Sequence, residues 1–132
     1  MVMNSNRRWI RIPIIYLVSN CMYLEFEKCN DILLVTLIGE LDHSSAEEVR
    51  IKIDDRIDRD DIRKVILNFS KVTFMDSSGI GAVVGRYKKI KNKGGKLFIA
   101  QTSKNVDRIF ELAGLYKLIH KYNTVDEAVS CI

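Results

Sequence analysis

Three polar side chains lie where an apolar run gives way to a helical pattern. Asp76, Ser77 and Ser78 follow the apolar residues of "VTFM" and precede a segment whose apolar residues recur at helical spacing. A carboxylate and two hydroxyls at such a junction can cap the helix, supply a nucleophile or accept a phosphate group. A cap role alone does not explain Gly79 and Gly81 in the helix that follows, because each glycine inside a helix lowers its stability by up to about 1 kcal/mol relative to alanine.

Nucleophilic catalysis is the least favoured of these three chemistries. His43 and Asp76 complete a conceivable triad with Ser77, but "MDSSGIG" lacks the G-x-S-x-G elbow of the hydrolases. The sequence also lacks a G-x-x-x-x-G-K-[ST] phosphate loop. A serine hydrolase is therefore the weakest alternative, and we assign neither a cofactor nor a metal.

Strands and helices alternate along the segments that must position this junction. Apolar runs predict strands over residues 23–28, 32–38, 64–69, 96–100 and 117–122. Amphipathic patterns predict helices that begin near residues 45, 77, 103 and 124. This order predicts an α/β fold, with a mixed sheet of about five strands that is mostly parallel after an N-terminal hairpin and carries about four helices.

The first helix and the end of the strand before it have their own signals. Ser44 with Glu47, and Ser45 with Glu48, form two overlapping capping boxes. Asp42 follows the second strand, as Asp76 follows the third. Because sites in such sheets gather at the carboxyl ends of strands, we expect these two aspartates to be neighbours.

The composition fits one cytoplasmic domain of ordinary kind. The 132 residues are 47% hydrophobic and carry a formal charge of +4, of which Arg7, Arg8 and Arg11 contribute three. The rest of the chain is nearly neutral, which argues against nucleic-acid binding. Three cysteines without paired or metal-like spacing predict free thiols in a reducing compartment.

Residues 1–21 differ in character from the rest of the chain. They combine arginines with the short apolar run 12–18, which contains Pro13 and is far too short to span a membrane. We expect a disordered extension or a start codon assigned too early, with Met22 as the working start. The domain itself is then expected to span residues 22–132.

Two segments of the chain resemble a known family. "GELDHSSAEEVR" and "VTFMDSSGIGAVVGRYKKIKNKGGKLFI" are similar to the anti-sigma factor antagonist family of STAS domains. The likeness runs from about Met22 to the C-terminus, and "MDSSG-x-G" followed by "GRYK" is its most specific part. It implies a STAS-like fold, phosphorylation of Ser77, which directly follows the aspartate, and partner contact through Asp42. We expect the partner-binding surface to include the rest of the junction as well, namely Asp76, Ser78, Gly79 and Gly81.

The resemblance also implies a function and two protein partners. The unphosphorylated protein is expected to bind an anti-sigma factor that is also a serine kinase, and so to release a sigma factor, sigma-F of sporulation. Phosphorylation of Ser77 is expected to end this binding and a PP2C-type phosphatase to restore it, while ATP belongs to the kinase. Two alternatives remain open, an antagonist in a general-stress sigma circuit and a STAS module that scaffolds a larger complex.

Overall fold

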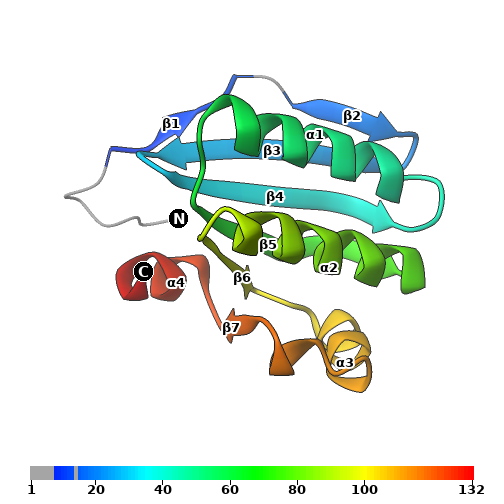
Figure 1. Ribbon diagram of the computed structural model, residues 1–132. Helices are drawn as coiled ribbons and strands as arrows, with labels where there is room; N and C mark the ends of the chain where they lie inside the picture. Colours follow the sequence, from blue (N-terminus) through cyan, green and yellow to red (C-terminus); the bar gives the residue numbers. More distant parts are fainter. Residues whose placement is uncertain (1–7, 14) are drawn as a thin grey trace.

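A mixed sheet forms the centre of the molecule, shown in Figure 1. The computed structural model describes residues 8–13 and 15–132, and within them the sheet has seven strands in the order β1-β3-β4-β5-β6-β7, with β2 also paired to β3. The strands are β1 (Ile10–Arg11), β2 (Tyr16–Ser19), β3 (Met22–Cys29), β4 (Ile32–Leu41), β5 (Lys64–Met75), β6 (Lys96–Ala100) and β7 (His120–Tyr122). Pairing is antiparallel up to β4 and parallel from β4 to β7. The predicted mixed sheet is confirmed, with two more strands than expected.

Within the described ranges, four α-helices connect and cover these strands, in agreement with the predicted number of about four. They are α1 (Ala46–Arg59), α2 (Ser77–Asn92), α3 (Lys104–Leu112) and α4 (Val125–Cys131), with a short 3-10 helix at Leu115–Lys117. Figure 1 shows α1 and α2 side by side on one face of the sheet. The 3-10 helix occupies the start of the predicted strand 117–122, so β7 begins only at His120.

The alternation of side chains along the strands builds two apolar clusters. In β4, Leu33, Val35 and Leu37 join the main cluster, which includes buried residues of α1, α2 and α3. Ile32 and Leu34 point the other way and pack in a second cluster with α4. Both faces of this strand are covered at its start, which explains why its sequence is almost continuously apolar.

The segment before Met22 differs from the expected disordered extension. Within its described residues, β1 and β2 both pair with β3. Ile12, Tyr16 and Val18 pack against the main cluster, and the Tyr16 hydroxyl accepts a hydrogen bond from Arg56 at 3.2 Å. Tyr16 and Val18 alternate along β2, so this part of the segment is ordered. Residues 1–7 and 14 lie outside the described residues, and the start site at Met22 stays a prediction.

Strand β5 is longer than its sequence pattern predicts. It continues past Phe69 to Met75, and its pairing with β4 shifts register twice on the way. Each shift inserts one extra residue in β5, so the buried residues Phe69, Val72 and Met75 are three apart and no longer alternate. The strand thereby carries the chain to the start of α2.

Candidate functional site

The strands β4 and β5 end together. Leu41 and Met75 are register partners, and the Asp76 amide donates a hydrogen bond to the Leu41 carbonyl at 3.4 Å. Asp42 and Asp76 are the next residues of the two strands. The expectation that these aspartates are neighbours at the carboxyl end of the sheet is confirmed.

Asp76 caps α2. Its backbone is extended, and its carboxylate accepts a hydrogen bond from the Ser78 amide at 2.8 Å. The Asp76 carbonyl accepts further bonds from the amides of Gly79, at 3.0 Å, and Ile80, at 3.3 Å. Most of the amides at this helix start are therefore already satisfied within the chain.

Ser77 is the first residue of α2, and its side chain is exposed. Its hydroxyl makes no hydrogen bond to any other residue in the described part of the chain, whereas the neighbouring Ser78 is half-buried. An exposed hydroxyl held at a fixed corner suits a group that a second protein must reach. Of the two serines, Ser77 is therefore the more accessible to a second protein.

Asp42 organises the loop between β4 and α1. Its carboxylate accepts hydrogen bonds from the Ser44 hydroxyl at 2.7 Å, the Ser44 amide at 2.9 Å and the Ser45 amide at 3.2 Å. The Ser44 hydroxyl, followed by the two amides, holds the pKa of the Asp42 carboxyl below its ordinary value against the effect of desolvation. The site therefore presents Asp42 as a carboxylate of fixed orientation.

The two predicted capping boxes are wrong. The hydroxyl of the buried Ser45 donates to the Glu40 carbonyl at 2.8 Å and makes no cap bond to α1. Glu47 instead accepts a hydrogen bond from Arg50 at 3.1 Å. The Asp42 carboxylate accepts the amides of Ser44 and Ser45, which the capping boxes would have given to Glu47 and Glu48.

The glycines of the junction serve two purposes. A Cβ on Gly79 would lie 2.8 Å from both the Leu41 carbonyl oxygen and the Met75 side chain, so Gly79 lets α2 start directly against the strand ends. Gly81 has open space around its Cα. It lines a shallow groove of about 230 Å³ between α1 and α2, to which Ser78 and Gly85 also contribute.

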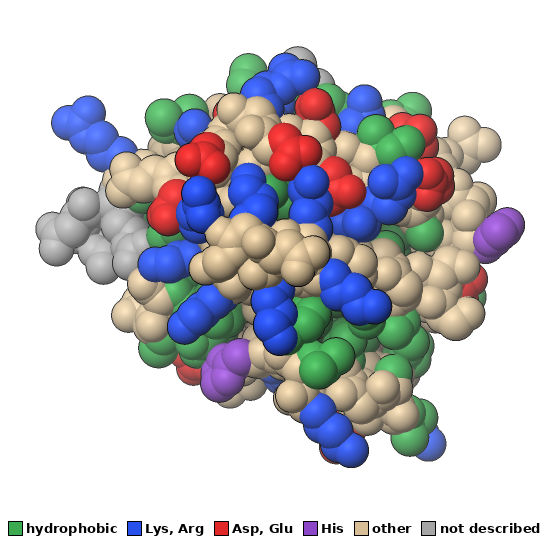
Figure 2. Space-filling view, viewed as in Figure 1, with side chains coloured by type: hydrophobic (Ala, Val, Ile, Leu, Met, Phe, Trp, Pro, Cys, Tyr) green, Lys and Arg blue, Asp and Glu red, His purple; other side chains and the backbone are tan. Residues whose placement is uncertain are grey.

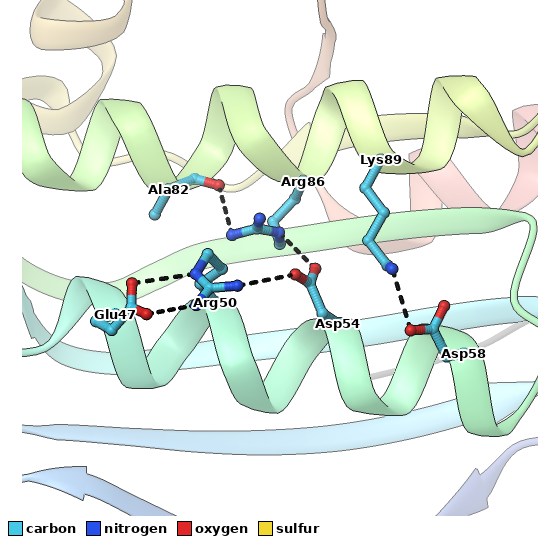
Figure 3. Close-up of polar contacts among 7 residues, drawn as sticks. All are labelled: Glu47, Arg50, Asp54, Asp58, Ala82, Arg86 and Lys89. Carbon is cyan, nitrogen blue, oxygen red and sulfur yellow. Dashed lines mark hydrogen bonds and ion pairs between the residues drawn. The ribbon is translucent and has the colours of Figure 1, made fainter.

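Charged side chains join α1 to α2 beside this groove (Figure 3). Arg86 is only 5% exposed and forms an ion pair of 2.7 Å with Asp54, while its guanidinium also donates to the Ala82 carbonyl at 3.3 Å. Lys89 and Asp58 form a second pair at 3.1 Å. Figure 2 shows acidic and basic side chains gathered over the two helices on this face. These two ion pairs hold α2 against α1, and the Ser77 corner lies at the start of α2.

Sequence reasoning did not identify the Arg86–Asp54 pair. Arg86 appeared only as part of "GRYK", where the resemblance and not its chemistry drew attention to it. The available signal was its spacing, because Arg86 shares the inward face of α2 with Val83 and Ile90. An arginine among buried apolar positions predicts a buried partner of opposite charge.

Other candidate chemistry receives no support from the described residues. Neither His43 nor His120 forms a hydrogen bond with Ser77, and the Asp76 carboxylate is occupied by the helix cap. Among residues 8–13 and 15–132, no three His, Cys, Asp or Glu side chains gather as metal ligands would. The three cysteines are free. Within the same ranges, every helix is too short or too polar to cross a membrane.

Comparison with known proteins places this site in a family context. The family model described as STAS domain matches residues 23–128. The chain is 35% identical to the anti-sigma F factor antagonist of Paenibacillus polymyxa over 83% of its own length and 93% of the relative's. It is 33% identical to the anti-sigma-B factor antagonist of Staphylococcus aureus over 62% of this chain and 75% of that one.

A solved structure with the same fold is the anti-sigma factor antagonist SpoIIAA in its unphosphorylated form. It superposes with a TM-score of 0.69 at 29% identity and covers 89% of this chain and 93% of its own. SpoIIAA in the phosphorylated form superposes with a TM-score of 0.62 at 28% identity, over 89% of this chain and 96% of its own. The predicted STAS-like fold is confirmed.

Proposed function

Because the chain belongs to the STAS domain family, we propose that it is an anti-sigma factor antagonist. In this proposal the unmodified protein binds an anti-sigma factor that is also a serine kinase, and the sigma factor is set free. The relatives named above carry this function in their names. The observation that carries the proposal is the exposed Ser77 hydroxyl at the corner shared by the ends of β4 and β5.

Phosphorylation of Ser77 is the proposed off-switch. The hydroxyl is exposed and unengaged among the described residues, and the structural neighbour SpoIIAA exists in a phosphorylated and an unphosphorylated form. A phosphoserine adds about −1.5 to −2 charges at pH 7. The helix start has few free amides left to bind this charge, since Asp76 already caps it. The phosphate would therefore project towards the partner without disturbing α2.

The energies favour an effect on docking over an effect on folding. Two like charges about 4 Å apart at an effective dielectric near 20 repel by roughly 4 kcal/mol. A complex of micromolar affinity has only about 8 kcal/mol of binding free energy. Half of that repulsion across an interface would weaken the complex more than tenfold. On the free protein the same phosphate stays in water, where screening reduces its interaction with Asp42 and Asp76.

We further propose that the circuit is that of sigma-F, with a PP2C-type phosphatase that restores the binding form in the cytoplasm. The anti-sigma F factor antagonist of Paenibacillus polymyxa matches over 83% of the chain, whereas that of Lysinibacillus sphaericus matches over 63% and the anti-sigma-B relative over 62%. The local chemistry of the corner is the same for both circuits. The choice of circuit therefore rests on the longer match to the Paenibacillus polymyxa relative and not on the geometry of Ser77.

Phosphorylation of the purified protein tests the proposal. The protein is incubated with ATP and either the anti-sigma-F or the anti-sigma-B kinase of its organism, and mass spectrometry locates the phosphate. We expect a single phosphate on Ser77, added faster by the anti-sigma-F kinase and removed by a PP2C-type phosphatase. Phosphate found only on Ser78 would overturn the assignment.

Matched variants separate docking from folding. Ser77→Asp is expected to keep its circular dichroism spectrum and melting temperature while it loses kinase binding. Ser130→Asp, at an exposed serine on α4, serves as the control for the added charge. Ser77→Ala is expected to bind the kinase without becoming phosphorylated. A Ser77→Asp protein that binds as tightly as the wild type would contradict the proposed switch.

A further inference from the structure

Phe74 is exposed because of the second register shift in β5. Gly39 pairs with Val72, and the next residue of β4, Glu40, pairs with Phe74, so Thr73 is the extra residue. Without this insertion, alternation would place Phe74 on the same face as Val72, inside the core. With it, Met75 takes the core position and Phe74 faces the other side of the sheet.

The exposure of Phe74 contrasts with its surroundings. Val72 and Met75 are 4% and 5% exposed, whereas Phe74 is 50% exposed. The pairing between β5 and β6 ends at Asn68, and the second cluster beneath α4 takes only Ile66 from β5, near the beginning of that strand. No helix in the described part of the chain therefore covers Phe74. β-Bulges are over-represented at sheet edges and next to active sites, where they re-aim a side chain.

The position of Phe74 connects the two halves of the Ser77 corner. Its register partner Glu40 lies two residues before Asp42, and Phe74 itself lies three residues before Ser77. The Thr73 hydroxyl donates to the Gly39 carbonyl at 3.3 Å, which fixes the bulge against β4. Phe74 thus borders the proposed docking surface on the sheet side, as Gly81 borders it on the helix side.

We propose that Phe74 is an aromatic anchor for the anti-sigma factor, an inference that rests on the proposed function. Aromatic side chains are enriched in protein interfaces, where a few buried anchors carry most of the binding energy. Docking over the Ser77 corner would bring the partner's surface onto the ring, and the ring would lose its contact with water. The apolar surface of the ring would therefore be buried on binding, where it contributes to affinity, and not on folding.

Binding kinetics of the full-length protein with the anti-sigma factor kinase test this inference. Phe74→Ala is expected to raise the dissociation rate by about tenfold or more, with a smaller effect on association. Leu118→Ala is the matched control, since Leu118 is 55% exposed and lies before β7 at the opposite end of the sheet. It should change the dissociation rate by less than about twofold, in line with a surface substitution outside the interface. Phe74→Tyr, which keeps the ring, should bind nearly as well as the wild type.

The outcomes separate this inference from the proposed function. If Phe74→Ala dissociates at the wild-type rate while Ser77→Asp fails to bind, the anchor role is wrong and the function stands. If the wild-type protein binds neither anti-sigma factor, the proposed function and the anchor role of Phe74 are both wrong. Hydrogen exchange on the wild-type protein gives a check that needs no variant. The amides of residues 73–75 should gain protection in the complex, and unchanged exchange there would overturn the anchor role.

Discussion

Arg86 of α2 and Asp54 of α1 form an ion pair of 2.7 Å at the junction of the two helices, with the Arg86 side chain almost fully buried. Burial lowers the pKa of the Arg86 guanidinium from its ordinary value, and the Asp54 charge opposes this shift. The pair therefore holds a desolvated cation in place behind the Ser77 corner. The pair is one of the contacts that join α2 to α1.

Loss of Asp54 should cost more stability than loss of Arg86. Asp54→Ala leaves a buried guanidinium without its partner, and breaking a buried pair in this way costs about 3–5 kcal/mol when both groups are fully buried. We expect a value near the lower end, since Asp54 is partly exposed. Arg86→Met removes the cation and leaves a carboxylate that Arg50 still approaches at 3.7 Å. Urea unfolding of both single variants and of the double variant measures the coupling, and additive effects would show that the pair is not a unit.

Alanine at Gly79 and at Gly81 should have opposite effects on stability. A Cβ at Gly79 meets the Leu41 carbonyl at 2.8 Å, so Gly79→Ala should lower the unfolding free energy by about 1–3 kcal/mol. At Gly81 nothing lies within 4 Å, so Gly81→Ala should raise it by up to about 1 kcal/mol through helix propensity. Thermal unfolding of the two variants measures the difference.

The Gly81→Ala variant also tests the docking surface. If the open space beside Gly81 admits the partner's backbone, the stabilised variant should bind the anti-sigma factor kinase more weakly. If Gly81→Ala is more stable than the wild type but binds the kinase with equal affinity, Gly81 does not belong to the docking surface. Gly94→Ala is no suitable control, because Gly94 has a φ of 78° that alanine adopts only with strain.

Asp42 should contribute to kinase binding in two ways, through the loop that its hydrogen bonds organise and through its negative charge. Asn at position 42 keeps the side-chain oxygen that receives the Ser44 and Ser45 amides, so Asp42→Asn should preserve the loop while Asp42→Ala loosens it. Both variants should weaken kinase binding by about tenfold if the charge contributes to docking. Calorimetric titration with the kinase measures this, and wild-type affinity of Asp42→Asn would limit Asp42 to a role in loop geometry.

The pH dependence of Asp42 follows from its hydrogen bonds. Its pKa in the folded protein is lower than the ordinary value of 3.8, chiefly because of the Ser44 hydroxyl. A carboxyl group of this kind stabilises the fold above its unfolded pKa, and this contribution is lost as the pH falls through the folded pKa. The stability difference between the wild type and Asp42→Asn should therefore be constant from pH 5 to 8 and shrink below about pH 4.

The sequence was sufficient for the order of the elements and for the Ser77 corner. The apolar runs located β3, β4 and β6. At three of the four predicted helix starts, Asp76, Ser103 and Thr124 each accept an amide hydrogen bond as the N-cap. These features are local, because a run of consecutive apolar residues indicates a buried strand and a few consecutive residues form a helix cap. The adjacency of Asp42 and Asp76 followed from the rule that parallel strands end at the same edge of the sheet.

Other features depend on contacts that a local pattern does not contain. The two extra residues of β5 break its alternation, so the strand seemed to stop at Phe69 and the exposure of Phe74 was hidden. The capping boxes at Ser44 and Ser45 failed because the Asp42 carboxylate, in the preceding loop, received those amides instead. The Arg86–Asp54 pair joins residues 32 positions apart on different helices. The register shifts and the Arg86–Asp54 pair depend on tertiary partners, whereas the capping boxes lost to a competing acceptor two and three residues earlier in the chain.

The described residues before Met22 should contribute to stability, because β2 pairs with β3 and packs on the core where a disordered extension was expected. Tyr16 lies edge-on to the ring of Phe26 with centroids 5.6 Å apart, and its hydroxyl accepts the Arg56 bond. A variant that begins at Met22 loses these contacts and those of Ile12 and Val18. Since each of these side chains is partly buried, we expect the unfolding free energy to fall by about 2–4 kcal/mol in total.

Two truncations separate the packing of this segment from its contact with the site. The Cys21 carbonyl accepts the Glu40 amide at 2.7 Å, two residues before Asp42. A variant that begins at Asn20 keeps this bond and loses the strands, so it should be less stable than the wild type but still bind the kinase with similar affinity. The variant that begins at Met22 should lose some affinity as well, because the Glu40 amide is left without its acceptor. Wild-type stability in both truncations would show that β1 and β2 contribute nothing to the fold, and chemical denaturation with binding titration measures both properties.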